Sequence, residues 1–154
     1  MDKGVYCLGF RNPACTARVG ALGEIRFRKG WHVYVGSALG PGGLARLQRH
    51  LRLAQSRDKR PKWHVDYLSV SPEFRLRFAV SAATDEPLEC TIAQIIAFHG
   101  GEGIPGFGCS DCSCPSHLFY FRSDPLDVLQ EVFVRAGDLA PATTLIRRDG
   151  EFST

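Results

Sequence analysis

The sequence predicts a single domain of the mixed α/β class, and three observations lead to that prediction. The chain has 154 residues, about the size of one ordinary domain. Its hydrophobic content of 44% and charged content of 23% are close to those of globular proteins, which excludes wholesale disorder and a fibrous repeat. Segments with the two-residue period of strands also alternate with segments of helical period. We therefore treat residues 1–154 as one domain.

The first quarter of the chain has the pattern of three strands. Residues 5–10 form an apolar run, residues 24–28 alternate polar and apolar side chains, and residues 31–36 resume the run after Gly30. Because only a short break separates the second and third segments, we expect them to form a hairpin. Residues 11–23 are expected to form an irregular loop, since Pro and Gly residues resist regular structure.

The middle of the chain is expected to contain a helix followed by two strands. Leucines recur at helical spacing over about residues 44–54, which predicts a helix with one buried face. Arg46 and His50 are four residues apart and would project together from this helix. Residues 63–68 (WHVDYL) alternate in the manner of a strand, and residues 74–80 predict another strand.

The C-terminal half is expected to begin with a helix from about residue 87, because apolar side chains again recur at helical spacing there. Residues 100–117 form a Gly-rich segment that also contains Cys and His, which predicts an irregular loop. Residues 118–154 would form a C-terminal extension, with a strand over 118–121 and a helix over 125–135.

Positive charge is concentrated in one segment of the chain. The net charge is only +3, but a single acid, Asp58, interrupts a run of seven basic side chains. These are Arg46, Arg49, Arg52, Arg57, Lys59, Arg60 and Lys62. Such a concentration attracts phosphate backbones. The alternative is a solvated helix face that continues into a basic loop.

The six cysteines are interpreted as reduced thiols or metal ligands rather than as a disulfide framework, since no secretory signal is visible. Four potential zinc ligands lie within nine residues: Cys109, Cys112, Cys114 and His117. A second possible set omits Cys109 and is completed by the distant Cys90. The remaining alternative is a loop packed with reduced thiols.

No segment approaches the roughly 18 apolar residues that a membrane-spanning helix needs. The N-terminus also lacks the long apolar region of a secretory signal. We therefore expect a cytoplasmic protein without a membrane partner.

Several short motifs occur in a characteristic order along the chain. Gly4-Val5-Tyr6 and Tyr34-Val35-Gly36 are followed by Arg46-Leu47-Gln48-Arg49-His50 and then by Glu89 at the beginning of a helix. Together these motifs resemble the GIY-YIG nuclease superfamily, with Val in place of Ile in each triplet. The resemblance implies a small central, mainly antiparallel sheet flanked by helices.

A closer resemblance covers nearly the whole chain. The runs YVGSALGPGGLARLQRH, WHVDYL and GFGCSDCSCPSHLFYF are similar to a largely archaeal branch of that superfamily. Some members of this branch are fused to endonuclease III-like repair proteins, which implies a DNA-related role by association.

The resemblance implies a catalytic set of five residues: Tyr6, Tyr34, Arg46, His50 and Glu89. Phosphodiester hydrolysis needs an activated water, a cation on the phosphate and positive charge for the developing dianion. Tyr6 would take a proton from water if nearby cations lower the pKa of its phenol, and Tyr34 would position that water or share the role. Arg46 would bind a phosphate oxygen, and His50 would hold a tyrosine hydroxyl or relay a proton. Glu89 would be a ligand of Mg²⁺ or Mn²⁺.

A second polar pair, His64 and Asp66, would share one face if residues 63–68 form a strand. There the two side chains could supplement the base or the metal ligand. The alternative is a His–Asp hydrogen bond that only fixes the strand beside the core.

The function expected from the sequence is that of a divalent-metal-dependent endonuclease, with DNA as its partner in repair or recombination. The basic side chains after Arg46 would bind the nucleic-acid backbone. The alternative is a non-catalytic nucleic-acid-binding module of the same fold with a structural Zn²⁺. A thiol-based redox protein has less support, because no Cys-x-x-Cys pair opens a helix.

Overall fold

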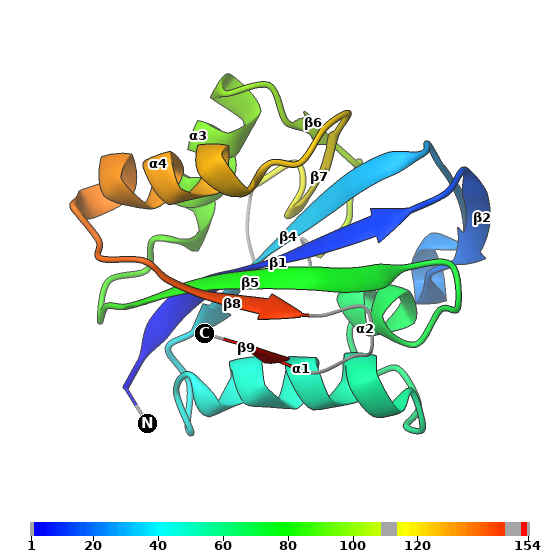
Figure 1. Ribbon diagram of the computed structural model, residues 1–154, viewed down its shortest axis with the longest axis horizontal. Helices are drawn as coiled ribbons and strands as arrows, with labels where there is room; N and C mark the ends of the chain where they lie inside the picture. Colours follow the sequence, from blue (N-terminus) through cyan, green and yellow to red (C-terminus); the bar gives the residue numbers. More distant parts are fainter. Residues whose placement is uncertain (1, 109–113, 147–151, 154) are drawn as a thin grey trace.

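The computed structural model describes residues 2–108, 114–146 and 152–153, and these form the mixed α/β fold that the sequence predicts (Figure 1). Within these residues seven strands build one sheet in which every neighbouring pair is antiparallel. In order across the sheet they are β6 (Glu102–Gly103), β7 (Leu118–Phe121), β4 (Gly30–Ala38), β1 (Gly4–Asn12), β5 (Arg75–Ala83), β8 (Ala142–Ile146) and β9 (Phe152–Ser153).

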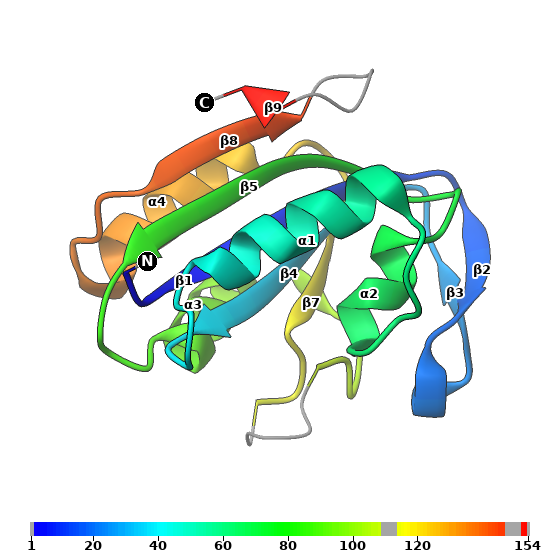
Figure 2. The same ribbon diagram turned by 90° about the horizontal axis from the view of Figure 1, so that it is seen from below.

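Helices cover both faces of the sheet. α1 (Ala45–Ser56) and α2 (His64–Ser69) lie on one face, and α3 (Glu89–Phe98) and α4 (Leu126–Gly137) lie on the other (Figures 1 and 2). Each face has its own hydrophobic core, because successive side chains of a strand point to opposite sides.

The central strand β1 shows this alternation clearly. Tyr6 and Leu8 belong to the core beneath α1 and α2, whereas Val5 and Cys7 belong to the core beneath α3 and α4. Burial on both faces explains why β1 has a continuous apolar run rather than alternating apolar and polar residues.

The predicted hairpin of residues 24–28 and 31–36 is wrong. β4 pairs with β1 along its whole length, from Gly4 opposite Ala38 to Asn12 opposite Gly30. The residues between these strands form a separate two-stranded sheet of β2 (Cys15–Arg18) and β3 (Glu24–Phe27). This small sheet stands at one end of the molecule (Figure 1). Part of the predicted loop is therefore a strand, and β4 lies between the buried strand β1 and β7 rather than beside β3.

The predicted strand over residues 63–68 is also wrong, because this segment forms α2. The carboxylate of Asp66, in the first turn, accepts hydrogen bonds from the backbone N–H groups of Lys62 (2.8 Å) and Trp63 (3.0 Å). These contacts satisfy donors that a helix start otherwise leaves unpaired. Val65 and Leu68, three residues apart, are fully buried.

The C-terminal extension contains the expected elements and two more. β7 spans residues 118–121 as predicted, and α4 begins and ends within two residues of its predicted limits. β8 pairs with the outer edge of β5 and β9 pairs with β8, and neither strand was predicted from the sequence. Among the described residues, no helix is both long enough and apolar enough to cross a membrane.

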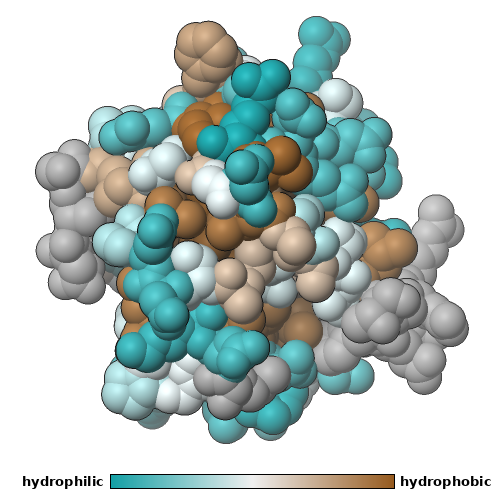
Figure 3. Space-filling view, turned by 90° about the vertical axis from the view of Figure 1, so that its left-hand side faces the viewer, coloured by the Kyte–Doolittle hydropathy of each residue, from teal (hydrophilic) through white to brown (hydrophobic). Residues whose placement is uncertain are grey.

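Few large hydrophobic side chains of the described residues are exposed: Trp63, Phe98, Val134 and Leu145. On the side of the molecule shown in Figure 3, hydrophobic surface is bordered by hydrophilic side chains, as is usual for a globular domain. Of the four exposed residues, Trp63 lies beside the cavity described below.

We expect the Asp66→Ala variant to lose about 2–4 kcal/mol of the free energy of unfolding in urea denaturation. The change removes the acceptor of two backbone N–H groups and leaves the guanidinium of Arg49 without its partner. Asp58→Ala is the control, because Asp58 is exposed and accepts a hydrogen bond from Ser56 at the surface. Equal losses in the two variants would contradict this account of α2.

Candidate functional site

A cavity of about 530 Å³ lies where β1, β4, α1 and the start of α3 meet. Its walls include all five candidate catalytic residues: Tyr6, Tyr34, Arg46, His50 and Glu89. The structure thus brings together side chains that are up to 83 positions apart in the sequence. The other residues around the cavity are Ser37, Lys62, Trp63, His64, Gly108 and His117.

The two tyrosines lie on the same face of the sheet because of the register between β1 and β4. Tyr6 is opposite Gly36 and Leu8 is opposite Tyr34, so the phenols are diagonal neighbours. The ring of Tyr6 lies over Gly36, and a Cβ atom at position 36 would overlap that ring. A glycine is therefore required at the end of the second triplet so that Tyr6 can lie across β4.

Tyr6 and His50 form a buried hydrogen bond, with 2.8 Å between the hydroxyl of Tyr6 and Nε2 of His50. Burial lowers the pKa of His50 to about 4, although Asp66 opposes this shift. The imidazole is therefore neutral near pH 7. If the hydroxyl donates to Nε2, the proton of the ring is on Nδ1. Among the described residues no hydrogen-bond partner reaches Nδ1, and the nearest carboxylate, Oδ1 of Asp66, is 3.8 Å away.

The phenol of Tyr6 is held in its protonated form. Burial raises its pKa well above the ordinary value of 10, and the proximity of Tyr34 and Glu89 raises it further. Arg46 acts in the opposite direction but does not outweigh the burial. On balance the cations near Tyr6 therefore do not lower the pKa of its phenol, which was the condition for Tyr6 to act directly as a base.

One wall of the cavity is positively charged and is organised around Trp63. Arg46 lies over the indole ring at 5.6 Å from its centroid, Arg49 at 4.5 Å and the amino group of Lys62 at 5.3 Å. Arg46 also donates a hydrogen bond of 3.1 Å to the backbone carbonyl of Ser37. The indole, 37% exposed, stabilises these cations through its ring face.

Glu89 contributes a half-buried carboxylate from the first turn of α3. Its Oε1 lies 3.7 Å from Nδ1 of His117. The sequence indicates His117 only as a zinc ligand, whereas the structure also places it beside Glu89 at the cavity. Burial lowers the pKa of His117, and a hydrogen bond with the backbone of Gly108 partly opposes this shift.

His64 and Asp66 do not share a face, because α2 replaces the expected strand. His64 lines the cavity, where its Nδ1 accepts a hydrogen bond of 3.0 Å from the backbone N–H of Gly108. Asp66 is fully buried behind the cavity and forms an ion pair with Arg49. Burial would raise the pKa of Asp66, but hydrogen bonds from Arg49, Trp63 and Lys62 outweigh it and the pKa is lowered.

The basic run divides into residues with internal partners and residues at the surface. Arg49 pairs with Asp66. Arg57, just beyond the end of α1, donates a hydrogen bond to the backbone carbonyl of Phe74. Four others are exposed: Arg52, Lys59, Arg60 and Lys62. Of these four, Lys62 lines the cavity.

The structure describes only half of the zinc ligand set expected for the Cys-rich loop, because Cys109 and Cys112 lie outside the described residues. Cys90 and Cys114 are joined as a disulfide, whereas the sequence favoured reduced thiols or metal ligands for all six cysteines. Their sulfur atoms and a ring nitrogen of His117 lie within 4.8 Å of one another, which is a cluster that could hold a metal ion. Cys7 and Cys15 are free thiols.

Two buried histidines predict a loss of stability at mildly acidic pH. Burial lowers the pKa of His32 and of His50 from 6.5 to about 4. The unfolded chain therefore takes up protons near pH 6.5 that the folded chain takes up only near pH 4. The free energy of unfolding falls as the pH falls through this window.

Urea denaturation should show a loss of about 2 kcal/mol per histidine between about pH 7 and about pH 5. In the His50→Gln variant the part of this loss that is due to His50 should disappear, while the part due to His32 remains. An unchanged pH dependence in that variant would contradict a neutral, buried His50.

Comparison with known proteins gives one match. A family model described as "Domain of unknown function DUF123" matches residues 5–138. No curated protein and no solved structure matches the chain significantly. The matched region contains every residue that lines the cavity, together with Cys90 and Cys114. Because this match spans most of the sequence, the chain belongs to the DUF123 family.

Proposed function

We propose that the protein is a divalent-metal-dependent endonuclease of the GIY-YIG type, which hydrolyses phosphodiester bonds in nucleic acid, with DNA as the first candidate. The observation that carries this proposal is the meeting of two phenols, a guanidinium, an imidazole and a carboxylate around one cavity. These are the groups at the positions where the sequence resembles that nuclease superfamily.

The positive wall of the cavity suits the phosphate of a substrate. The planar guanidinium of Arg46 can donate two hydrogen bonds to phosphate oxygens, and the amino group of Lys62 adds a second charge. Both side chains contact Trp63, so they are oriented before a substrate binds. Positive groups placed in advance stabilise the charge that develops on the phosphate during hydrolysis.

The attacking water must lose a proton, and its proposed acceptor, the phenol of Tyr6, already carries one. Because burial keeps the proton on Tyr6, this residue can act as a base only when it passes that proton on. Nε2 of His50, 2.8 Å from the hydroxyl, is in place to accept it. Asp66, whose Oδ1 lies 3.8 Å from Nδ1 of His50, would stabilise the imidazolium that forms. Tyr34, which also lines the cavity, would orient the water.

The residues at the cavity fit a hard divalent cation. Glu89 offers a half-buried carboxylate, and Mg²⁺ needs only one or two carboxylates because it retains most of its water ligands. The neighbouring phenols are oxygen donors as well. When bound, Mg²⁺ or Mn²⁺ would supply positive charge to the scissile phosphate.

The exposed basic side chains near the cavity would extend the binding surface. Arg52 lies on α1, and Lys59, Arg60 and Lys62 follow in the loop that leads to α2. Lys62 reaches the cavity and so connects this surface to the reacting phosphate. Binding through such contacts weakens steeply as the salt concentration rises.

A second candidate function is a non-catalytic nucleic-acid-binding module that holds a structural metal ion. The cluster of Cys90, Cys114 and His117 and the high pKa of Tyr6 favour this alternative. A bound zinc ion without cleavage of duplex, flapped or branched DNA would support the binding module rather than the enzyme.

We expect Glu89→Gln to reduce Mg²⁺-stimulated DNA cleavage by at least about 100-fold, since the amide is a weaker ligand than the carboxylate. The Kd for DNA should change by no more than about twofold. Tyr6→Phe should cause a similar loss of turnover, because it removes the hydroxyl that takes the proton.

Glu86→Gln is the matched control, because Glu86 is an exposed acid just before α3 and should leave cleavage unchanged. Circular dichroism would verify that each variant is folded. Full residual cleavage in Glu89→Gln, with or without a loss of DNA binding, would contradict the assignment.

A further inference from the structure

A second group of reactive side chains lies next to Glu89. Cys90 follows Glu89 at the start of α3, and Cys114 and His117 precede β7. One potential ligand atom from each of these three residues lies within 4.8 Å of the other two. Nε2 of His117 is 3.9 Å from Sγ of Cys90. Cys114 and His117 are buried, at 7% and 2% exposed, whereas Cys90 is partly exposed, so solvent meets the cluster on the side of Cys90.

The backbone holds this cluster in place from several sides. The N–H of His117 donates to the carbonyl of Phe107, and the carbonyl of His117 accepts from the N–H of Val35 in β4, each at 2.9 Å. Cys90 is part of the first turn of α3. The ligand atoms thus belong to segments whose positions the sheet and α3 determine.

The kind of ligand atom selects the kind of ion. Two thiolates and one imidazole are soft or borderline donors, which prefer Zn²⁺ and related ions to Mg²⁺. Three protein ligands suffice for a zinc ion that takes a further ligand from solvent. This site therefore differs in chemistry from the oxygen donors around Glu89.

His117 connects the two sites. Its Nε2 is on the side of Cys90, and its Nδ1 lies 3.7 Å from Oε1 of Glu89, which is an ion-pair distance rather than a hydrogen-bond distance. A histidine that ligates a metal ion through one nitrogen usually presents its other N–H to a carboxylate or a carbonyl, and that outer partner is oriented in return. We propose that reduced Cys90, Cys114 and His117 bind one Zn²⁺, and that the bound His117 positions the carboxylate of Glu89 in the cavity.

The disulfide and the bound metal ion exclude each other, because both use the sulfur atoms of Cys90 and Cys114. A dithiol reductant cleaves the Cys90–Cys114 bond with two electrons, and its own two sulfurs become a disulfide. The two protein thiols that form then lose their protons to solvent as Zn²⁺ binds to the sulfur atoms. Oxidation by a disulfide reagent reverses the first step and releases the ion.

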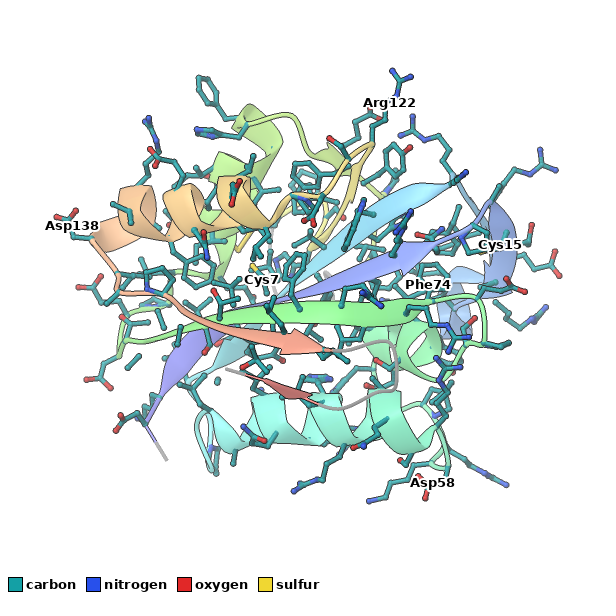
Figure 4. The ribbon with its side chains drawn as sticks, in the orientation of Figure 1. Cys7, Cys15, Asp58, Phe74, Arg122 and Asp138 are labelled. Atoms are coloured by element: carbon teal, nitrogen blue, oxygen red, sulfur yellow. A yellow bond between two sulfur atoms is a disulfide. The ribbon has the colours of Figure 1, made fainter. Side chains whose placement is uncertain are left out.

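The first test is elemental analysis of the full chain after incubation with Zn²⁺ and a dithiol reductant. We expect one Zn²⁺ per chain, retained in Cys15→Ser and lost in Cys90→Ser and in Cys114→Ser. Cys15 is a suitable control because it is a free thiol on β2, at one end of the molecule (Figure 4). Oxidation of the wild-type chain should release the zinc.

Spectroscopy of the Co²⁺-loaded wild-type chain tests the site without any substitution, so its result does not depend on whether a variant folds. A thiolate-to-cobalt charge-transfer band should appear in the reduced protein and disappear on oxidation. The proposal is overturned if the reduced protein binds no zinc, or if Cys90→Ser retains a full equivalent. It is also overturned if Cys109→Ser and Cys112→Ser lose the ion while Cys90→Ser keeps it.

The link to Glu89 is tested by the binding of Mn²⁺, which needs no cleavage activity. His117→Gln should weaken the Kd for Mn²⁺ by about tenfold, Glu89→Gln should abolish binding, and Cys15→Ser should leave it unchanged. An unchanged Kd in His117→Gln overturns the positioning role. This role rests on the proposed function, in which Glu89 is a ligand of the divalent cation. If the zinc-loaded wild type binds no Mn²⁺, the proposed function fails while the zinc site stands.

Discussion

The register between β1 and β4 is the constraint on which the rest of the site depends. It sets Tyr6 opposite Gly36 and Leu8 opposite Tyr34, so both phenols point to the face that α1 covers. A slip of one residue in β1 would move Tyr6 to the opposite core, beneath α3 and α4. The overlap of Tyr6 with any side chain at position 36 couples this register to the glycine. The cavity, the Tyr6–His50 hydrogen bond and the proton path that we propose all follow from it.

Local patterns predicted most of the elements, and long-range pairing explains the failures. The leucine spacing of α1 and the apolar run of β7 are properties of contiguous residues, so both were predicted closely. β4 pairs with β1 across an insertion that forms the separate β2–β3 sheet, and with β7 from much later in the chain. Nothing local to residues 24–36 indicates either pairing. The segment that forms α2 has only six residues, too few for its apolar pattern to distinguish a strand from a helix. The hydrogen bonds that the Asp66 carboxylate accepts from the preceding backbone N–H groups favour the helix.

The residues of the candidate site could be predicted from the sequence, but their burial and their contacts with one another could not. The order of the motifs pointed to the five side chains that the structure brings to one cavity. Burial of Tyr6, which raises the pKa of its phenol, depends on the packing of α1 over the sheet. The proximity of His117 to both Glu89 and Cys90 depends on where β7 begins relative to α3. Trp63 carried no signal of its own, although its neighbours in the basic run were evident.

The most direct test of the central claim is a crystal structure of the protein soaked with Mn²⁺, with the ion located by its anomalous scattering. The account predicts an ion in the cavity with a carboxylate oxygen of Glu89 among its ligands, and with the hydroxyls of Tyr6 and Tyr34 facing the same space. An ion bound elsewhere, or a cavity in which Glu89 turns away from both phenols, would contradict it.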